Sequence, residues 1–344
     1  MPILPFAAQL APAMQVLKRL TQIAPKEPKM TLGVDIGSTS VKVVALGARK
    51  GLGARPLIGQ HITPLEPGQE VDASDTLKAA VGALSLPLRM VNLSVSGQWV
   101  IIRVVEMPTM KPAEMKQALP FEAQRYLPFP IQDVVIDGAA LGAADANKMW
   151  VLIVACKKEL LVRRIDWAKR AGFGVALIDV DALALANSFL AQANGRHGAS
   201  TRALINVGAQ LTNLVVFKGD VPYLVRDISW GGEKLARGAA DQLGAEVATV
   251  KTELLKGQVS REVQEAMRLA VESLSSELQL SFDYFENRFG QPPEELLVSG
   301  GLSLCPPFLE AVKSHVTQTV NPWAPANGLS GQFAVAYGLA LRAA

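Results

Sequence analysis

The segment Gly33-Val34-Asp35-Ile36-Gly37-Ser38-Thr39-Ser40-Val41-Lys42 constrains the fold more than any other part of the chain. β-branched and apolar residues on both sides, Leu32 to Ile36 and Val41 to Leu46, predict two strands joined by a tight Gly/Ser/Thr turn. Such a turn presents converging backbone N–H groups without side-chain obstruction, which is how phosphate chains are bound. Asp35, at the end of the first strand, is placed to hold a magnesium ion through water molecules. The pattern therefore predicts a phosphate-binding hairpin.

The same design recurs about 170 residues later, with Ala203 to Val207, a turn through Gly208 to Thr212, and Asn213 to Lys218. A third site follows at Leu296 to Gly301, where an apolar strand runs into a Gly pair before a helix that begins near Pro306. Glycine there lets the backbone approach a flat base closely. Two matching hairpins predict two halves that each build a sheet and face one another across a cleft, which is a natural ligand site.

Composition excludes several classes of protein. A chain of 344 residues is long enough for two or more packed domains. The 34 Lys and Arg against 31 Asp and Glu leave a net charge of only +3 without a basic run, which predicts no nucleic-acid partner. Cys156 and Cys305 are far apart, so neither a disulfide framework nor a zinc site is expected, and a reducing cytoplasm fits best. No apolar stretch approaches the roughly 20 residues of a membrane span.

The residues between the two hairpins predict a compact inserted subdomain of strand, helix, strand and strand, followed by a further helix. The expected elements are Trp99 to Met107, Pro112 to Tyr126, Val134 to Leu141, Trp150 to Ala155 and Lys158 to Ala171. Pro120 is expected to kink or shorten its helix.

Two further segments carry a clear pattern. Apolar residues from Val263 to Phe289 recur at steps of three or four, which predicts one long amphipathic helix. Residues 1–29 contain five prolines and are interpreted as a tail with at most a short helix from Ala13 to Ile23. Packing of this helix against its own domain is favoured over docking on a membrane surface or a partner.

Together with Tyr126-Leu127-Pro128-Phe129-Pro130, Arg226 to Leu235 with its Gly231-Gly232, and Phe282 to Leu304, the first hairpin resembles the PilM family of type IV pilus assembly proteins. The resemblance runs from about residue 31 to the end. It implies an α/β, actin-like fold, a ribonuclease H-like design duplicated into two lobes, with a subdomain arranged as in the related protein FtsA. The implied domains are a tail at 1–29, a first lobe at 30–98, 174–199 and about 331–344, an inserted subdomain at 99–173, and a second lobe at 200–330.

The resemblance also implies a site for ATP and Mg. The residues expected to face the phosphates are Asp35, with Mg held through water, and Gly37, Ser38, Thr39 and Ser40; those expected to close on them from the other half are Gly208 and Thr212. Gly300 and Gly301 would lie by the base. Glu233 and Lys234 are candidates for the ribose side, although a solvated helix start explains them equally well.

Two departures from the family pattern weaken the expectation of hydrolysis. Many actin-like proteins have Asp at the second phosphate turn, where this chain has Asn206, an amide that supplies no charge to a metal shell. The family also tends to place an acidic residue three positions before the lysine that resembles Lys251, and here that residue is Ala248. ATP is therefore expected to act mainly as structural glue.

The function implied by the resemblance is that of a cytoplasmic assembly protein at the inner face of the inner membrane. Its partner would be the cytoplasmic N-terminal peptide of a PilN-like inner-membrane protein, docked between the first lobe and the inserted subdomain, with other pilus machine components as more distant contacts.

Alternatives remain open. One is an actin-superfamily enzyme, either a small-molecule kinase or an ATPase that is at most slow, in which Gln210 or Glu233 would be the base. Another is a filament-forming cytoskeletal protein. His61, His197 and His315 are scattered and are expected to be surface residues, and no P-loop motif occurs.

Overall fold

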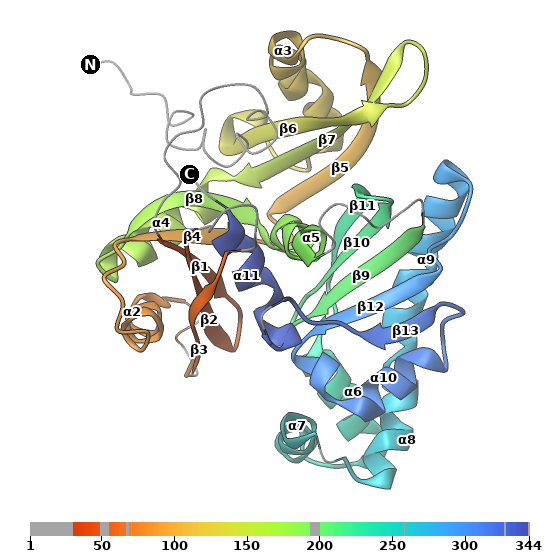
Figure 1. Ribbon diagram of the computed structural model, residues 1–344. Coiled ribbons are helices and arrows are strands. Elements are labelled where there is room, and N and C mark those ends of the chain that lie inside the picture. Colours follow the sequence, from red (N-terminus) through yellow and green to blue (C-terminus); the bar gives the residue numbers. More distant parts are fainter. Residues whose placement is uncertain are drawn as a thin grey trace. The chain divides into compact units, whose positions relative to one another are not determined.

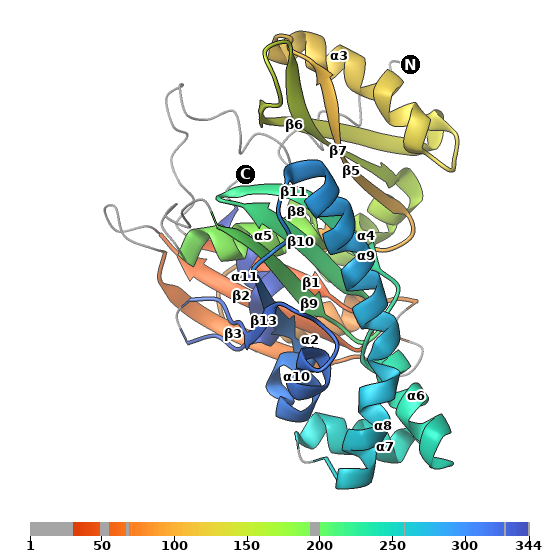
Figure 2. The same ribbon diagram turned by 90° about the vertical axis from the view of Figure 1, so that its right-hand side faces the viewer.

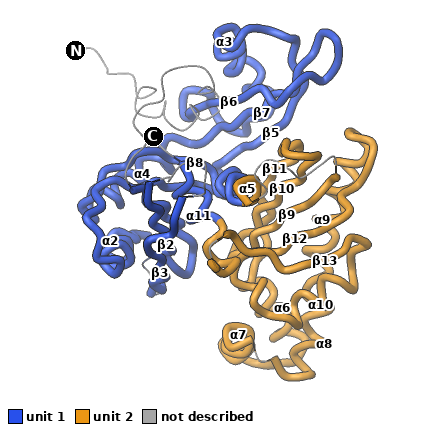
Figure 3. The backbone as a smooth tube through the Cα atoms, viewed as in Figure 1, with its two compact units in different colours: residues 1–188, 335–344 blue, residues 189–334 orange. Residues whose placement is uncertain are grey.

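The computed structural model describes residues 30–48, 55–66, 69, 71–192, 200–257, 259–326 and 328–342 (Figure 1; Figure 2). The predicted tail at 1–29 lies outside these residues. The chain divides into two compact units, residues 1–188 with 335–344 and residues 189–334 (Figure 3). Among the described residues, no helix is both long and apolar enough to cross a membrane.

The first unit is built on a five-stranded sheet of order β3-β2-β1-β4-β8. β1, β2 and β3 are antiparallel neighbours, whereas β4 and β8 run parallel to β1. The strands are β1 Met30–Ile36, β2 Ser40–Gly47, β3 Leu57–Pro64, β4 Met90–Val95 and β8 Gly174–Val180. Helices α2 Ser74–Gly82 and α4 Lys158–Arg170 pack against these strands, and α5 Asp181–Gln192 follows β8 directly. The predicted first hairpin is confirmed.

A second sheet of the first unit lies between β4 and β8 in the chain and has the order β5-β7-β6, with all neighbours antiparallel. Its strands are β5 Val100–Pro108, β6 Val134–Ala143 and β7 Lys148–Lys157. Helix α3 Pro112–Ala123 packs on β6 and β7 through Met115 and Leu119. The helix predicted to reach Tyr126 changes to a 3₁₀ turn at Gln124–Tyr126, because Pro120 lacks the N–H that would bind the carbonyl of Lys116.

The second unit repeats the first sheet, with the order β11-β10-β9-β12-β13. Its strands are β9 Thr201–Val207, β10 Thr212–Lys218, β11 Val221–Ile228, β12 Glu295–Gly300 and β13 Thr319–Pro322. Again the first three are antiparallel and the last two run parallel to β9. The same order and directions in both units confirm the duplicated, actin-like α/β fold.

Helices cover one face of this second sheet around an aromatic core that includes Trp230, Phe282, Phe285 and Phe308. They are α6 Gly232–Leu243, α7 Val247–Lys256, α8 Arg261–Ala270, α9 Glu272–Phe289 and α10 Pro306–Lys313. The single helix predicted over 263–289 is divided at Val271, but its backbone hydrogen bonds continue: Val271 N–H donates to Met267 and Ser275 N–H donates to Val271. Figure 2 shows α8 and α9 as one run.

The last helix of the chain, α11 Ala334–Leu341, closes the first unit. The side-chain amide of Asn92 on β4 donates to the carbonyls of Leu339 (2.8 Å) and Arg342 (2.9 Å), and the Thr31 hydroxyl on β1 donates to the carbonyl of Ala340. Arg342 also forms a buried ion pair with Asp179 on β8. Burial raises the pKa of Asp179, while Arg342 opposes that rise.

Gly338 on α11 provides a test of this close packing. A β-carbon at Gly338 would overlap the carbonyl oxygen of Ala184 on α5, whereas a β-carbon at Gly82, the last residue of α2, would meet nothing within 4 Å. We expect Gly338→Ala to lower the free energy of unfolding by about 1–3 kcal/mol or more, because backbone must move. The matched Gly82→Ala should be neutral or stabilising by up to about 1 kcal/mol. Urea unfolding compares them, and equal stabilities would contradict the contact.

Candidate functional site

The first predicted turn joins β1 to β2 in the first unit. The N–H of Gly37 donates to the carbonyl of Ser40 at 3.0 Å, and the Thr39 carbonyl accepts from the N–H of Leu65 at 2.9 Å. Gly37, Ser38 and Ser40 are partly exposed and Thr39 is exposed, so all four are accessible from solvent. The turn is thus a closed loop, held from behind, whose outer surface is open to a ligand.

Asp35 is buried at the end of β1 and lies opposite Lys42 in the strand register. The Lys42 Nζ atom lies 3.1 Å from the Asp35 Oδ2 atom, so the turn carries a cation as well as a carboxylate. The sequence motif contains Lys42, but it was not selected as a site residue; its register partner gives the signal. No cluster of three or more His, Cys, Asp or Glu side chains suits a metal within the described ranges. Asp35 therefore fits magnesium only as the notional water-mediated ligand, with the remaining positions filled by water or phosphate.

Arg164 on α4 also reaches this turn, and no sequence pattern indicated it. Its Nη2 atom donates to the carbonyl of Ile36 at 3.2 Å, although the two residues are 128 positions apart. The guanidinium lies over the Trp167 ring, 4.8 Å from its centroid. Burial lowers the pKa of Arg164, and the carboxylates of Asp181 and Asp35 act in the opposite direction. Two cationic side chains thus flank the first turn.

The second turn, in the second unit, is closed by a hydrogen bond from Gly208 N–H to the Leu211 carbonyl at 2.9 Å. It is joined directly to the start of α6, because the N–H groups of Gly232 and Glu233 donate to the carbonyls of Gly208 and Ala209. A β-carbon at Gly231 would lie 2.5 Å from the Ala209 oxygen, so a glycine is required there. The first amides of α6 are consequently occupied by the turn and do not form a free anion site.

Thr212 was expected to contact phosphate, but the structure assigns its side chain another role. The residue is completely buried, and its hydroxyl donates to the carbonyl of Trp230 at 2.8 Å. β10 is an interior strand paired on both sides, which removes Thr212 from the surface. The hydroxyl therefore holds the loop before α6 in place and is not presented to a ligand.

Gly300 and Gly301 end β12 beside the second turn. Gly300 has φ +89°, and a β-carbon there would overlap the backbone of Val207, so only glycine fits. Gly301 is exposed and begins the 3₁₀ turn η4 Gly301–Leu304. The Leu302 side chain of this turn lies 3.9 Å from the β-carbon position of Gly232. The second unit therefore brings the second turn, the Gly pair and the start of α6 together.

The polar side chains at the start of α6 interact with one another. The Gln210 Nε2 atom donates to a Glu233 carboxylate oxygen at 3.2 Å, and the Lys251 Nζ atom of α7 lies 4.0 Å from the other oxygen. Lys234 is exposed. Gln210 and Glu233, the two residues considered as a catalytic base, are thus partners of each other, and Lys251 adds a cation to the group.

Asn206 belongs to a row of polar side chains that crosses four strands, with Ser299, Asn206, Asn213 and Asp227 as successive register partners. The Asn213 amide donates to Asp227 at 2.8 Å, the Asn206 amide donates to Asn213 at 3.2 Å, and the Ser299 hydroxyl lies 3.4 Å from the Asn206 oxygen. An ionised carboxylate only accepts, so Asp227 sets the direction of both amides. Asn206 is a neutral, oriented group.

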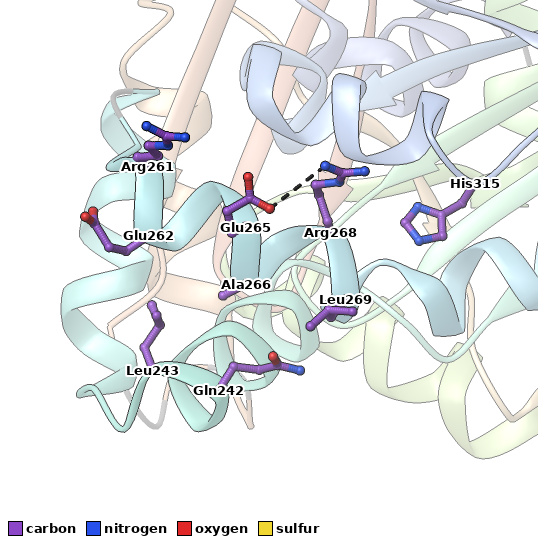
Figure 4. A pocket seen from close by; sticks show the side chains of 9 residues that line it. All are labelled: Gln242, Leu243, Arg261, Glu262, Glu265, Ala266, Arg268, Leu269 and His315. Atoms are coloured by element: carbon purple, nitrogen blue, oxygen red, sulfur yellow. Dashed lines mark ion pairs between the residues drawn. The ribbon is translucent and has the colours of Figure 1, made fainter.

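A depression of about 650 Å³ on the second unit lies elsewhere. It is lined by Gln242, Leu243, Arg261, Glu262, Glu265, Ala266, Arg268, Leu269 and His315 (Figure 4). Gln242 and Leu243 end the 12-residue helix α6, about 18 Å along the helix from Gly232. Its arginines alternate with glutamates, and Arg268 lies 3.9 Å from Glu265, so the depression does not resemble a polyphosphate site.

The role assigned to Thr212 leads to a prediction. Thr212→Val keeps the shape of the side chain but leaves the Trp230 carbonyl unpaired, so the free energy of unfolding should fall by about 1–3 kcal/mol. Affinity for ATP should stay unchanged in the folded protein. Thr249→Val, at an exposed position on α7, is the matched control and should change neither quantity. Urea unfolding and calorimetric titration measure the two effects; weaker ATP binding without lost stability would restore the original expectation.

Solved structures share this fold. A structure described as a PilM-PilN type IV pilus biogenesis complex matches with a TM-score of 0.80 and 24% identity, over 92% of this chain and 99% of that one. The ethanolamine utilization protein EutJ from Carboxydothermus hydrogenoformans matches with 0.54 and 14%, over 95% and 94%. MreB5 of Spiroplasma citri bound to ADP matches with 0.50 and 11%, over 91% and 95%. At these identities the likeness shows the actin-like fold alone.

The family is shown by a different comparison, which uses the sequence. A family model described as "Type IV pilus assembly protein PilM" matches residues 33–344, nearly the whole chain. The match begins at Gly33, the first residue of the phosphate-turn segment, and includes all three glycine sites. The chain therefore belongs to the PilM family of type IV pilus assembly proteins.

Proposed function

We propose that this protein is an ATP-binding component of a type IV pilus machine that docks a membrane-anchored partner. The observation that carries the proposal is the recurrence of a closed glycine turn after the first strand of both five-stranded sheets. Family membership supports the pilus role, and MreB5, which shares the fold, was solved with ADP bound. The phosphates would contact Gly37, Ser38, Thr39, Ser40 and Gly208, and the base and ribose would contact Gly300, Gly301, Glu233 and Lys234.

The bound nucleotide would stabilise the folded protein more than it drives a reaction. At an ATP concentration 100 times Kd, binding alone contributes about 2.7 kcal/mol of stability without turnover. Asn206 supports this reading, because its amide adds no charge to the second turn and is held in one orientation by the row that ends at Asp227. Magnesium would be held by phosphate oxygens and by water on Asp35.

The enzyme alternative has weaker support. A kinase or fast ATPase needs a base in contact with a substrate hydroxyl or water. Gln210 and Glu233 instead hydrogen bond to each other, and Lys251 lies beside Glu233. A filament-forming role rests on the fold alone, and fold does not establish function.

The partner proposed is the short cytoplasmic N-terminal peptide of a PilN-like inner-membrane protein, which would place this chain at the inner face of the inner membrane, next to other machine components. An aromatic cluster where the chain enters the β5-β7-β6 sheet suits such a peptide. Trp99 is 39% exposed and its ring lies 6.3 Å from that of Phe129, with Lys157 Nζ 4.0 Å above the Trp99 ring. Tryptophan in a partly exposed cluster is a typical binding hot spot.

ATP binding is tested with Asp35→Ala. We expect the native protein to bind ATP with magnesium, to unfold at a higher temperature when ATP is present, and to release almost no phosphate over hours. Asp35→Ala should weaken binding by about tenfold or more in magnesium but much less in EDTA, because the charge-assisted hydrogen bonds to metal-bound water are lost. Calorimetric titration and a phosphate-release assay provide the two readouts.

Asp133→Ala removes the same charge at an exposed position of the first unit and is the control. Substantial turnover that depends on a second substrate would favour the enzyme. If the native protein bound no ATP, it would be an actin-like interaction module without a nucleotide.

Partner docking is tested with Trp99→Ala and a fluorescent peptide from the N terminus of a PilN-like protein. Loss of the indole should weaken peptide binding by about tenfold, as expected for a hot-spot aromatic residue. Phe121→Ala is the matched control, since Phe121 is a more exposed aromatic residue (77%) on α3 of the same sheet and should have little effect. Fluorescence anisotropy measures both, and equal affinities for the two variants would exclude the Trp99 cluster as the docking point.

A further inference from the structure

We propose that Arg164 is a phosphate-binding residue at the first turn, contributed by a helix outside the turn's own hairpin. The inference rests on the proposed ATP binding and adds a residue that neither the motif nor the family match assigns. The ligand group it would contact is the phosphate chain of the nucleotide, at the end of β1.

The position of Arg164 is fixed by α4, which follows β7 directly and packs on β4 and β8. From there its Nη2 atom donates to the carbonyl of Ile36 at 3.2 Å. Ile36 is the residue immediately before Gly37. The guanidinium therefore lies within one residue of the backbone amides that form the turn, and Trp167 supports its plane from one side at 4.8 Å.

The hydrogen bonds of Arg164 are incomplete. Its Nε atom is buried and has no hydrogen-bond partner among the described residues. A buried donor left unpaired costs about 1–3 kcal/mol, and more when it belongs to a charged group. Such atoms are rare in folded proteins and often mark a ligand site. An anionic oxygen next to the turn would supply the acceptor that the protein does not.

The charges around the turn favour a phosphate as that acceptor. Lys42 is paired with Asp35 at 3.1 Å, so much of its charge is balanced within the protein. The charge of Arg164 is opposed by its burial and supported by Asp181 and Asp35. A guanidinium stays protonated under these conditions and presents a planar fork of donors that matches phosphate oxygens. Arg164 would thus bind phosphate through geometry as well as charge.

A purely structural role for Arg164, holding the Ile36 carbonyl, predicts a different result. Such a clamp would affect every ligand of the site equally and would lower stability. A phosphate-binding residue would affect ATP and ADP but not adenosine, which lacks the group. The dependence on ligand charge separates the two roles.

The experiment compares Arg164→Met and Arg164→Lys with Arg163→Met in the full chain. Arg163 is the matched control, because it is the neighbouring arginine on α4 and lies 5.7 Å from the same Trp167 ring, but is exposed. Calorimetric titration with ATP, ADP and adenosine gives affinities, and thermal unfolding without ligand gives stability. We expect Arg164→Met to weaken ATP binding by about ten- to hundredfold, as for a lost hydrogen bond to a charged group. Adenosine binding should not change, and Arg163→Met should resemble the native protein.

Arg164→Lys keeps the charge without the fork, so its ATP affinity should lie between the native protein and Arg164→Met; it also serves if the Met variant does not fold. If native protein binds ATP and the Arg164 variants bind it equally well, the role of Arg164 is refuted while the ATP proposal stands. An equal loss for ATP and adenosine assigns Arg164 to structure and also refutes it. If the native protein binds no ATP, both proposals fail together.

Discussion

The first unit depends on the close approach of α11 to the sheet and to α5. Gly33 on β1 and Gly338 on α11 each stand where a side chain would overlap the backbone of the other layer, so helix and sheet meet without side chains between them. Asn92, Thr31 and the pair of Asp179 with Arg342 then satisfy the polar groups at the end of the helix. Because an unpaired buried carbonyl is costly, these contacts allow essentially one seating of α11. The last residues of the chain thereby fix β1, the strand that leads to Asp35 and the first turn.

Much of the fold follows from local patterns. Runs of β-branched residues interrupted by Gly37 and Gly208 identify both hairpins, since such residues suit strands and glycine suits tight turns. The glycines of the site were predictable for the same reason, and the structure gives Gly300 a positive φ and no room for a side chain. The prediction was less accurate at α3 and at Val271, where a proline and a single turn residue redefine helix boundaries that periodicity alone does not resolve.

The remaining site residues depend on contacts between distant segments. Arg164 reaches Ile36 only because α4 packs on β4 and β8, and nothing near Arg164 in the sequence resembles a phosphate motif. Thr212 failed in the opposite direction. Its residue type suits a phosphate turn, but pairing of β10 on both sides buries it and gives its hydroxyl to Trp230. A hydroxyl near a glycine turn is therefore a poor predictor until the strand order is known.

Asn206 shows how a single substitution acts through a sheet. Replacing a carboxylate by an amide at the second turn would leave a group that can present either its oxygen or its nitrogen. Asp227, two strands away, removes that freedom, because it accepts from Asn213, which in turn accepts from Asn206. The oxygen of Asn206 then faces Ser299, and its nitrogen is occupied. Such a position can contribute a fixed dipole but no charge to stabilise a metal ion. This arrangement suits a nucleotide that is retained more than one that is consumed.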